Sequence, residues 1–234
     1  GLQRHIEPAR ADEAGQHAAC LAAREDVDLV STGGCGRGDI RQRDLAAVRR
    51  RLQEAASITY IGEMLRDGDS ALARWPDRQR QPIRVWVQPR PLVADWRPEY
   101  ADQARAAFER WELVGLPIRF AFLADSAAAE VHVMWIERFA ADTRIGNTHR
   151  VHDQNWWIVD GDISIAMQTA TGRVLQPAVI RTTTLHEVGH LLGLGHTSDT
   201  TSVMAARSHG VTELSGADLA TVRLLYSLPP GSVR

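Results

Sequence analysis

The sequence lacks lysine altogether, so its 27 basic residues are all arginine. They are balanced by 29 acidic residues, which leaves a formal net charge of −2 and gives no reason to expect nucleic acid or an anionic membrane as a partner. Long apolar runs are also missing: no window approaches the roughly 18 consecutive apolar residues that a membrane-spanning helix needs. The sequence therefore predicts no integral membrane segment. Hydrophobic residues at 44% and charged residues at 24% are ordinary for a globular chain, which argues against wholesale disorder.

Cysteine is scarce, with Cys20 and Cys35 as the two in the chain. Two cysteines are too few for a disulfide framework, but they could form one bridge or stay as free thiols. The chain begins at Gly1 instead of methionine, so we expect a processed product from which a signal peptide could have been removed. Composition alone leaves the cellular compartment open.

The N-terminal third differs in character from the rest of the chain. Residues 9–25 and 41–56 are alanine-rich with interspersed charges, a pattern typical of amphipathic helices, and the glycines of residues 31–39 indicate a loop between them. A proline-bounded polar stretch at 75–82 marks a boundary. We therefore expect a helical N-terminal segment at 1–78, either a prosegment or an accessory element, and a main domain at 79–234.

Strand and helix patterns alternate after this boundary. Residues 83–87 alternate apolar and polar side chains as a strand does, and residues 98–111 carry proline at the start and an apolar stripe, as a buried helix does. Further strands are expected at 118–122 and 131–136, a hairpin at 148–167 that turns at 159–162, and helices at about 177–192 and 215–228. This order predicts an α+β fold with a mixed sheet.

Residues 186–196 carry the chemistry, with the sequence HEVGHLLGLGH. On a helix, His186 and His190 lie one turn apart, so both imidazoles project from one face and can share a metal ion. Gly193 stands where the helix must end, because glycine tolerates the left-handed conformation of a C-terminal cap. The chain can then turn back and bring His196 to the same ion. Three neutral histidines with an open fourth position are typical of catalytic zinc, and Glu187 lies where it could reach a water at the metal.

The alternative is that these histidines are ordinary surface or core residues. A single histidine on a helix usually is, and the five-residue HExxH pattern alone is a moderate signal. Five specified positions across residues 186–196 are a different matter, since average amino-acid usage predicts on the order of 10⁻⁵ such patterns in a chain of this length. The sequence therefore favours a metal site.

The same string resembles the long zinc motif of the metzincin metallopeptidases, which continues to a methionine turn. Met204 follows His196 at the spacing of the matrixins, the matrix metallopeptidase-like branch assigned to peptidase family M10. Thr197 fits the serine or threonine of matrixins at that position and not the residues of the astacin, adamalysin or serralysin branches. The segment from Leu214 to Tyr226 is similar to the C-terminal helix of matrixin catalytic domains. The resemblance covers roughly residues 80–230 and suggests a bacterial type of matrixin.

The resemblance implies a fold and a set of roles. The fold would be a metzincin catalytic domain with a twisted mixed five-stranded sheet, an active-site helix and a C-terminal helix. His186, His190 and His196 would bind one catalytic Zn²⁺, and Glu187 would be the general base. Met204 would lie beneath the metal, which is equally compatible with a core position. Asp218 would hydrogen-bond into the methionine turn, and Gly193 would support the bend.

The chain also departs from the matrixin pattern. Ala206 stands where matrixins commonly have proline, which leaves the wall of the specificity pocket undefined. Animal matrixins bind a structural zinc and calcium ions in a histidine- and aspartate-rich loop. The nearest residues here do not have that spacing, so a second Zn²⁺ or Ca²⁺ site competes with a hairpin that carries surface polar residues. They are His149, His152, Asp153, Asp160 and Asp162.

The implied reaction is hydrolysis of peptide bonds in a protein or peptide substrate. By analogy with the family, the strand at 148–158 would be the sheet edge to which a substrate adds as a further strand. Trp156 and Trp157 either line that cleft or are packing residues. Residues 197–202 and 205–212 would shape the specificity pocket. Enzymes with such an open zinc site usually act outside the cytosol, so we expect a secreted or cell-envelope protein.

Two rival functions stay open on the sequence. One is a zinc-binding module without catalysis, against which Glu187 argues, since a structural site needs no base and more often has a fourth ligand. The other is a latent zymogen in which residues 1–78 cover the cleft. Cys35 bears on the second, because it shares the short Cys-Gly-x-x-Asp frame of the inhibitory matrixin prosegment motif. Zinc capping by Cys35, a bridge to Cys20 and free thiols are the alternatives for this residue.

Overall fold

The computed structural model describes residues 37–67, 70–139, 143–207 and 210–234. The chain divides into two units, residues 1–40 and 41–234, and apart from the first residues of one helix the description below concerns the second. The helix expected at 9–25 and both cysteines lie outside the described residues. Within them, no helix combines the length and apolar character needed to cross a membrane.

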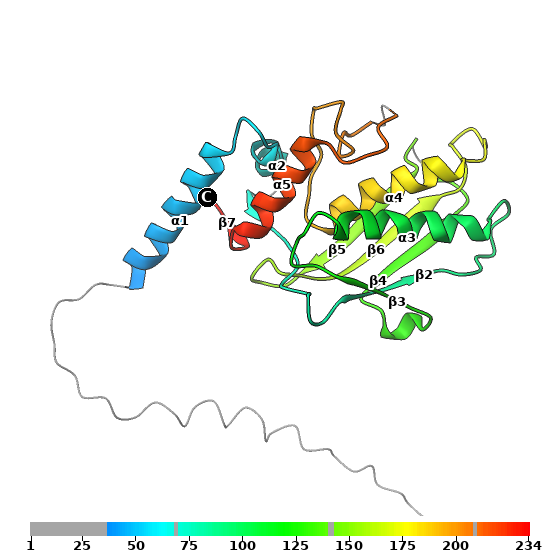
Figure 1. Cartoon of the computed structure of the whole chain (residues 1–234), viewed down its shortest axis with the longest axis horizontal. Coiled ribbons are helices and arrows are strands. Elements are labelled where there is room, and N and C mark those ends of the chain that lie inside the picture. Colours follow the sequence, from blue (N-terminus) through cyan, green and yellow to red (C-terminus); the bar gives the residue numbers. More distant parts are fainter. Residues whose placement is uncertain (1–36, 68–69, 140–142, 208–209) are drawn as a thin grey trace, which may run out of the picture. The chain divides into compact units, whose positions relative to one another are not determined.

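A five-stranded sheet forms the centre of the second unit (Figure 1). Its strand order is β3-β2-β4-β6-β5, in which β2, β3, β4 and β6 run parallel and β5 is the antiparallel edge strand. The strand bounds are β2 Ile83–Val87, β3 Phe120–Leu123, β4 Val131–Ile136, β5 Gly146–His152 and β6 Ile158–Ala166. The mixed five-stranded sheet and the α+β class expected from the sequence are confirmed.

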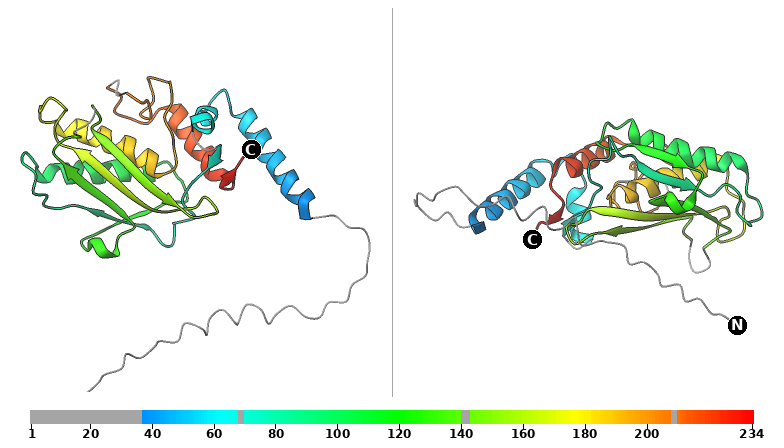
Figure 2. Two further views of the ribbon diagram at one scale, coloured as in Figure 1. Left: turned by 180° about the vertical axis from the view of Figure 1, so that it is seen from behind. Right: turned by 90° about the horizontal axis from the view of Figure 1, so that it is seen from below.

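Two long helices, α3 Pro98–Glu112 and α4 Pro177–Leu191, pack against each other on one face of the sheet (Figure 2). In β2 the side chains of Ile83, Val85 and Val87 are buried while those between them are not, because successive side chains of a strand point to opposite faces. The apolar stripe predicted on α3 is buried in full. This packing gives α4 a rigid position between the sheet and α3.

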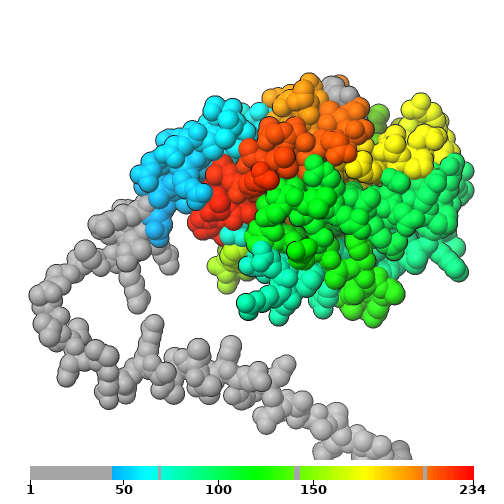
Figure 3. All heavy atoms as spheres, viewed as in Figure 1, coloured from blue at the N-terminus to red at the C-terminus, as the bar shows by residue number. Residues whose placement is uncertain are grey.

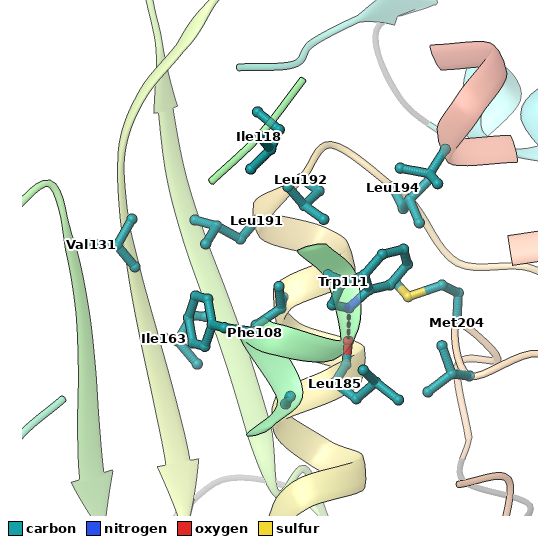
Figure 4. Close-up of a cluster of buried hydrophobic side chains, with 14 of the residues drawn as sticks. Phe108, Trp111, Ile118, Val131, Ile163, Leu185, Leu191, Leu192, Leu194 and Met204 are labelled. Atoms are coloured by element: carbon teal, nitrogen blue, oxygen red, sulfur yellow. Dashed lines mark hydrogen bonds between the residues drawn. The ribbon is translucent and has the colours of Figure 1, made fainter. Parts of the chain in front are cut away.

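The interior between α3 and α4 includes polar as well as apolar contacts (Figure 4). Trp111 on α3 is buried, and its indole Nε1 donates a hydrogen bond to the carbonyl oxygen of Leu185 on α4 at 2.9 Å. Met204 lies next to this indole in the close-up and is fully buried. Met204, which was predicted to lie beneath the metal, is therefore a core residue. The two interpretations of this methionine are compatible with each other.

The remaining elements are the C-terminal helix α5 Gly216–Ser227, α1 Arg37–Glu54, α2 Ile61–Asp67 and a two-stranded antiparallel sheet of β1 Ala71–Leu72 and β7 Gly231–Ser232. The short helix η1 Ser126–Ala128 connects β3 to β4. Arg51 on α1 donates to the carbonyl oxygen of Ser227 at 3.0 Å, and atoms of α1 and α5 lie side by side in Figure 3. Val48, Tyr60 and Leu72 are buried in the same core as the sheet. Side chains from both sides of the boundary predicted after residue 78 thus share one interior.

The position of the hairpin turn was predicted wrongly. Residues 159–162 lie inside β6, and the chain turns between His152 and Ile158 instead. There Asp153 closes the turn, because its carboxylate accepts backbone N–H bonds from Asn155 at 2.8 Å and from Trp157 at 2.9 Å. The Asp-Gly signal at 160–161 was misleading because Gly161 is a packing residue, where an added Cβ would lie 2.6 Å from Leu191 Cδ1.

The loop expected at 31–39 needs a smaller correction. Helix α1 begins at Arg37, so its residues 37–39 are helical, while residues 31–36 lie outside the described part of the chain. Helix formation here is consistent with the arginine- and alanine-rich sequence that follows, since both residue types have high helix propensity.

Candidate metal centre

Three histidine side chains converge at the C-terminal half of α4. His186 and His190 lie one turn apart on the helix, and His196 comes from the loop that follows. Nε2 of His190 lies 3.0 Å from Nε2 of His186 and 3.2 Å from Nε2 of His196. Among the described residues, these form the one group in which three possible metal ligands lie within 4.8 Å of one another.

The bend that brings His196 back depends on Gly193. This residue has φ of 108°, a conformation that side chains other than glycine rarely adopt. An added Cβ would also overlap the carbonyl oxygen of Ala73, so the position is closed to larger residues on two counts. The helix therefore ends where the motif predicts, and the loop turns toward the ligands on α4.

Hydrogen bonds determine which ring nitrogen of two of these histidines faces the point where the three side chains meet. Nδ1 of His186 lies 2.6 Å from the carbonyl oxygen of Val203, and Nδ1 of His190 lies 2.9 Å from that of Leu194. A carbonyl oxygen only accepts, so each Nδ1 carries the proton and each Nε2 presents a lone pair. The Nε2 atoms of His186 and His190 lie 3.0 Å apart, and their lone pairs repel each other unless a cation lies between them. The donor set therefore fits a metal ion that prefers imidazole nitrogen, such as zinc.

The protonation of the histidines agrees with this role. Burial is the largest cause of a lowered pKa for all three. The neighbouring imidazoles also lower the pKa of His186 and His190, since like charges would meet, and the pKa of His190 falls to about 3. The side chains are therefore neutral near pH 7, the form in which imidazole binds a metal.

Glu187 lies beside the histidines and is buried, with 5% of its surface exposed. Its Oε2 accepts a hydrogen bond from the hydroxyl of Thr148 on the edge strand at 2.7 Å. Burial raises the pKa of Glu187 to about 7, and the bond from Thr148 opposes that shift. A cation held by the histidines would favour the ionised carboxylate. The carboxyl group can thus both accept and release a proton near neutral pH.

Gly146, at the start of β5, leaves the space that this carboxylate occupies. A Cβ at residue 146 would overlap Oε1 of Glu187 and would lie 2.7 Å from Cγ2 of Thr183. Thr183 is buried on the rigid helix α4, so the carboxylate is the group that would have to move. The backbone of the edge strand therefore determines where the acidic side chain lies.

The loop beneath the ligands is connected to α5 through a buried carboxylate. Asp218 Oδ1 accepts a hydrogen bond from the Ser202 hydroxyl, and its Oδ2 accepts from the backbone N–H of Val203 at 3.2 Å. Asp218 also completes the capping box that begins α5 at Ser215. Met204 follows directly and is fully buried. Asp218 therefore links the start of α5 to the turn whose Val203 carbonyl orients His186.

An open cleft of about 890 Å³ runs past these groups. One wall is the edge strand β5, the floor is α4, and the other wall comes from residues 202–207 and 210–212. Glu187 is the one carboxylate among its described lining residues, whereas Arg144, Arg150 and Arg207 also line it. Two segments were expected to shape a specificity pocket. The described residues of 205–212 line the cleft, whereas Ser202 is the one residue of 197–202 that does.

The residues considered for a second metal do not form a three-donor group. His149 on β5 pairs with Asp162 on β6, and Oδ1 of Asp162 lies 3.4 Å from Nδ1 of His132 on β4. Asp153 instead closes the hairpin turn. A second Zn²⁺ or a Ca²⁺ ion therefore has no three-donor group among the described residues.

The two tryptophans of the hairpin have packing roles. The ring of Trp156 stacks on that of His152 with centroids 4.4 Å apart, and the guanidinium of Arg74 lies 4.7 Å from the centroid of the Trp157 ring. Neither residue lines the cleft. The alternative of a cleft role is therefore wrong for this structure.

Several residues of the site were not predicted from the sequence. Thr148 and Gly146 carry no motif, and only their place on a strand beside α4 gives them a role. Arg150 is the third: its Nη1 donates to the carbonyl oxygen of His190 and, at 3.4 Å, to that of Leu194. An arginine on a polar strand was the signal available, but the acceptor lies 40 residues away in sequence.

Comparison with known proteins gives a consistent picture. The family model of the matrixins matches residues 91–227. Metalloendoproteinase 5-MMP of Arabidopsis thaliana is 26% identical over 176 residues, which cover 67% of this chain and 46% of that protein. Metalloendoproteinase 1 of Glycine max is 34% identical over 89 residues, 36% of this chain and 27% of that protein. The chain spans less than half the length of these relatives, and as plant proteins they do not support the expected bacterial type.

Proposed function

Because this chain belongs to the matrixin family, we propose that it is a zinc-dependent endopeptidase. One observation carries the proposal: the Nε2 atoms of three neutral histidines meet in an open cleft, with a buried glutamate beside them. The family match supports zinc in general, and the donor set of this chain fits zinc in particular.

The ion would be held by His186, His190 and His196 through Nε2. When bound, zinc supplies Lewis acidity, which lowers the pKa of a coordinated water toward neutrality and polarises a carbonyl group. The Val203 and Leu194 carbonyl oxygens keep His186 and His190 in the required tautomer. Because these acceptors are backbone atoms of the core and of the loop, the ligands are oriented before the metal arrives.

Glu187 would act as the general base. Its carboxylate accepts the proton of the attacking water and later donates it to the departing amine of the cleaved peptide. Thr148 holds Oε2 at 2.7 Å, which leaves the other oxygen, Oε1, for this transfer. The surroundings that raise its pKa make the first half of the task easier, since a very acidic carboxyl group would be too weak a base to take a proton from water.

A peptide substrate would bind along β5. This strand lies at the sheet edge and lines the cleft, so an extended peptide can add to it through backbone hydrogen bonds. Small and apolar side chains of Ala178, Val179 and Val211 offer an uncharged place for a substrate side chain near the metal. The location outside the cytosol and the inhibitory role of residues 1–78 stay predictions.

The test compares the full-length chain with Glu187→Gln, which keeps the side-chain volume. We expect one zinc per chain in both proteins, and cleavage of a quenched peptide library that falls at least about 100-fold in the variant. Glu99→Gln on the exposed start of α3 is the matched control and should cleave as wild type does. Zinc in both proteins with equal cleavage would contradict the assigned base. Zinc without cleavage in either would favour the non-catalytic or latent alternative.

A further inference from the structure

The third metal ligand lies in a setting unlike that of the other two. His186 and His190 are on the rigid helix α4 and each has a carbonyl partner at Nδ1. His196 lies on the loop after Gly193 and is exposed. Its ring contacts the other two imidazoles, and the carboxylate of Asp67 at the end of α2 acts on it electrostatically. Its position must therefore come from the backbone of its loop.

That loop is bound by α2, an element upstream of the matrixin match. Oε2 of Glu63 accepts a hydrogen bond from the backbone N–H of Ser198 at 2.6 Å, and Oε1 accepts one from the Ser198 hydroxyl at 3.2 Å. Ser198 follows His196 by two residues. On its other side, Gly195 packs on Met64, since an added Cβ there would lie 3.2 Å from Met64 Cγ. Side chains of α2 thus contact the loop immediately before and after the ligand.

The other end of α2 is anchored in the core. Tyr60, which precedes the helix, is 4% exposed, and its hydroxyl donates to Asp218 Oδ1 at 3.2 Å. Its backbone N–H donates to the Thr221 hydroxyl on α5 at 3.2 Å, and Ile61 is buried. An anchored helix can hold a loop, whereas a mobile one could not.

From these contacts we propose that Glu63 is a positioning residue of the metal centre, which holds the loop of His196 in the conformation that completes the ligand set. The segment from Tyr60 to Asp67 is then part of the catalytic unit and not a removable cover. This inference rests on the proposed zinc site, and it concerns residues that precede the matrixin match at 91–227. Loss of such a supporting contact typically weakens metal affinity about 10- to 100-fold.

The experiment measures the zinc dissociation constant of the full-length chain by competition with a chromophoric chelator. Glu63→Ala should weaken binding about 10-fold, and Glu63→Gln should restore most of the affinity because its amide oxygen still accepts from Ser198. The visible spectrum of the Co²⁺-substituted protein should change in Glu63→Ala, since it reports ligand geometry. Glu54→Ala on α1, whose side chain is 68% exposed, is the matched control.

Three outcomes would overturn the inference. Wild-type zinc affinity and an unchanged cobalt spectrum in Glu63→Ala would remove it while leaving the proposed function intact. An unprotected Ser198 amide in hydrogen exchange of the metal-free wild type would do the same, and this measurement needs no variant to fold. Wild-type protein that binds no zinc would overturn both this inference and the proposed function.

Discussion

At the scale of single residues, the reactive groups are held by neighbours that have no chemistry of their own. Glu187 is oriented by the Thr148 hydroxyl and by the space that Gly146 leaves, and both belong to the edge strand β5. The same strand is the proposed partner of the substrate. The position of the base and the position of the peptide are therefore set by one backbone, which favours their alignment.

Gly146→Ala tests this arrangement. The added methyl group would overlap the carboxylate of Glu187, and because Thr183 cannot yield, the carboxylate should be displaced. We expect kcat to fall about 100-fold, as for other displacements of a catalytic group by about 1 Å, while zinc content stays the same. Steady-state kinetics with metal analysis measure both. Gly216→Ala on α5, where no atom lies within 4 Å of the added Cβ, is the control. A wild-type kcat in Gly146→Ala would show that the base has room to adjust.

At the scale of elements, the C-terminal end of α4 is joined to β5 by Arg150. The last carbonyl oxygens of a helix have no partner within the helix. One of them, the carbonyl oxygen of His190, accepts a hydrogen bond from Arg150. It also lies 3.4 Å from the carbonyl oxygen of Leu194, which accepts from Nδ1 of His190. A positive charge at a helix C-terminus is favourable to the helix dipole. Arg150 therefore links the edge strand, the helix end and the start of the ligand loop.

Replacement of this arginine should cost stability even without metal. Arg150→Met keeps the length of the side chain but removes the donor, so partly buried carbonyl oxygens lose a charged partner. We expect the free energy of unfolding of the metal-free protein to fall by about 1–3 kcal/mol, measured by urea denaturation. Arg105→Met should change it by less than about 1 kcal/mol, because its pair with Asp102 is exposed. Equal effects of the two substitutions would contradict the proposed link.

The elements themselves were largely predictable from the sequence, and their connections were not. Strands 83–87 and 131–136 and the starts of α3 and α4 follow from apolar periodicity and from proline at a helix start, which are local signals. The approach of His186 to His190 follows from helical spacing for the same reason. The turn of the hairpin was misplaced because Gly161 serves packing against Leu191 and not chain reversal. The contact of Glu63 with Ser198 spans 135 residues and has no local signature.

At the scale of the whole molecule, the proposed metal centre lies where separate segments meet. Its ligands come from α4 and the following loop, which contacts α2 through Glu63 and the turn at Met204 through the backbone N–H of Thr197 at 3.1 Å. That turn is bound by Asp218 at the start of α5. An ion bound to the three histidines therefore holds together elements from the beginning, middle and end of the second unit, and local loss of any one should weaken the others.

Metal removal should consequently lower the melting temperature of the 234-residue chain. A ligand that binds only the folded state at about 1,000 times its dissociation constant stabilises it by about 4 kcal/mol. For a domain of this size each kcal/mol corresponds to roughly 2–4 °C, so a chelator should lower Tm by about 8–16 °C, and added zinc should restore it. The control is His196→Ala, which removes one ligand from an exposed position and should melt at nearly the same temperature with or without chelator. The contrary outcome is a wild-type Tm that stays unchanged although the chelator has removed the zinc. The histidines would then be held entirely by the protein, with α2 and Asp218 sufficient to organise the site.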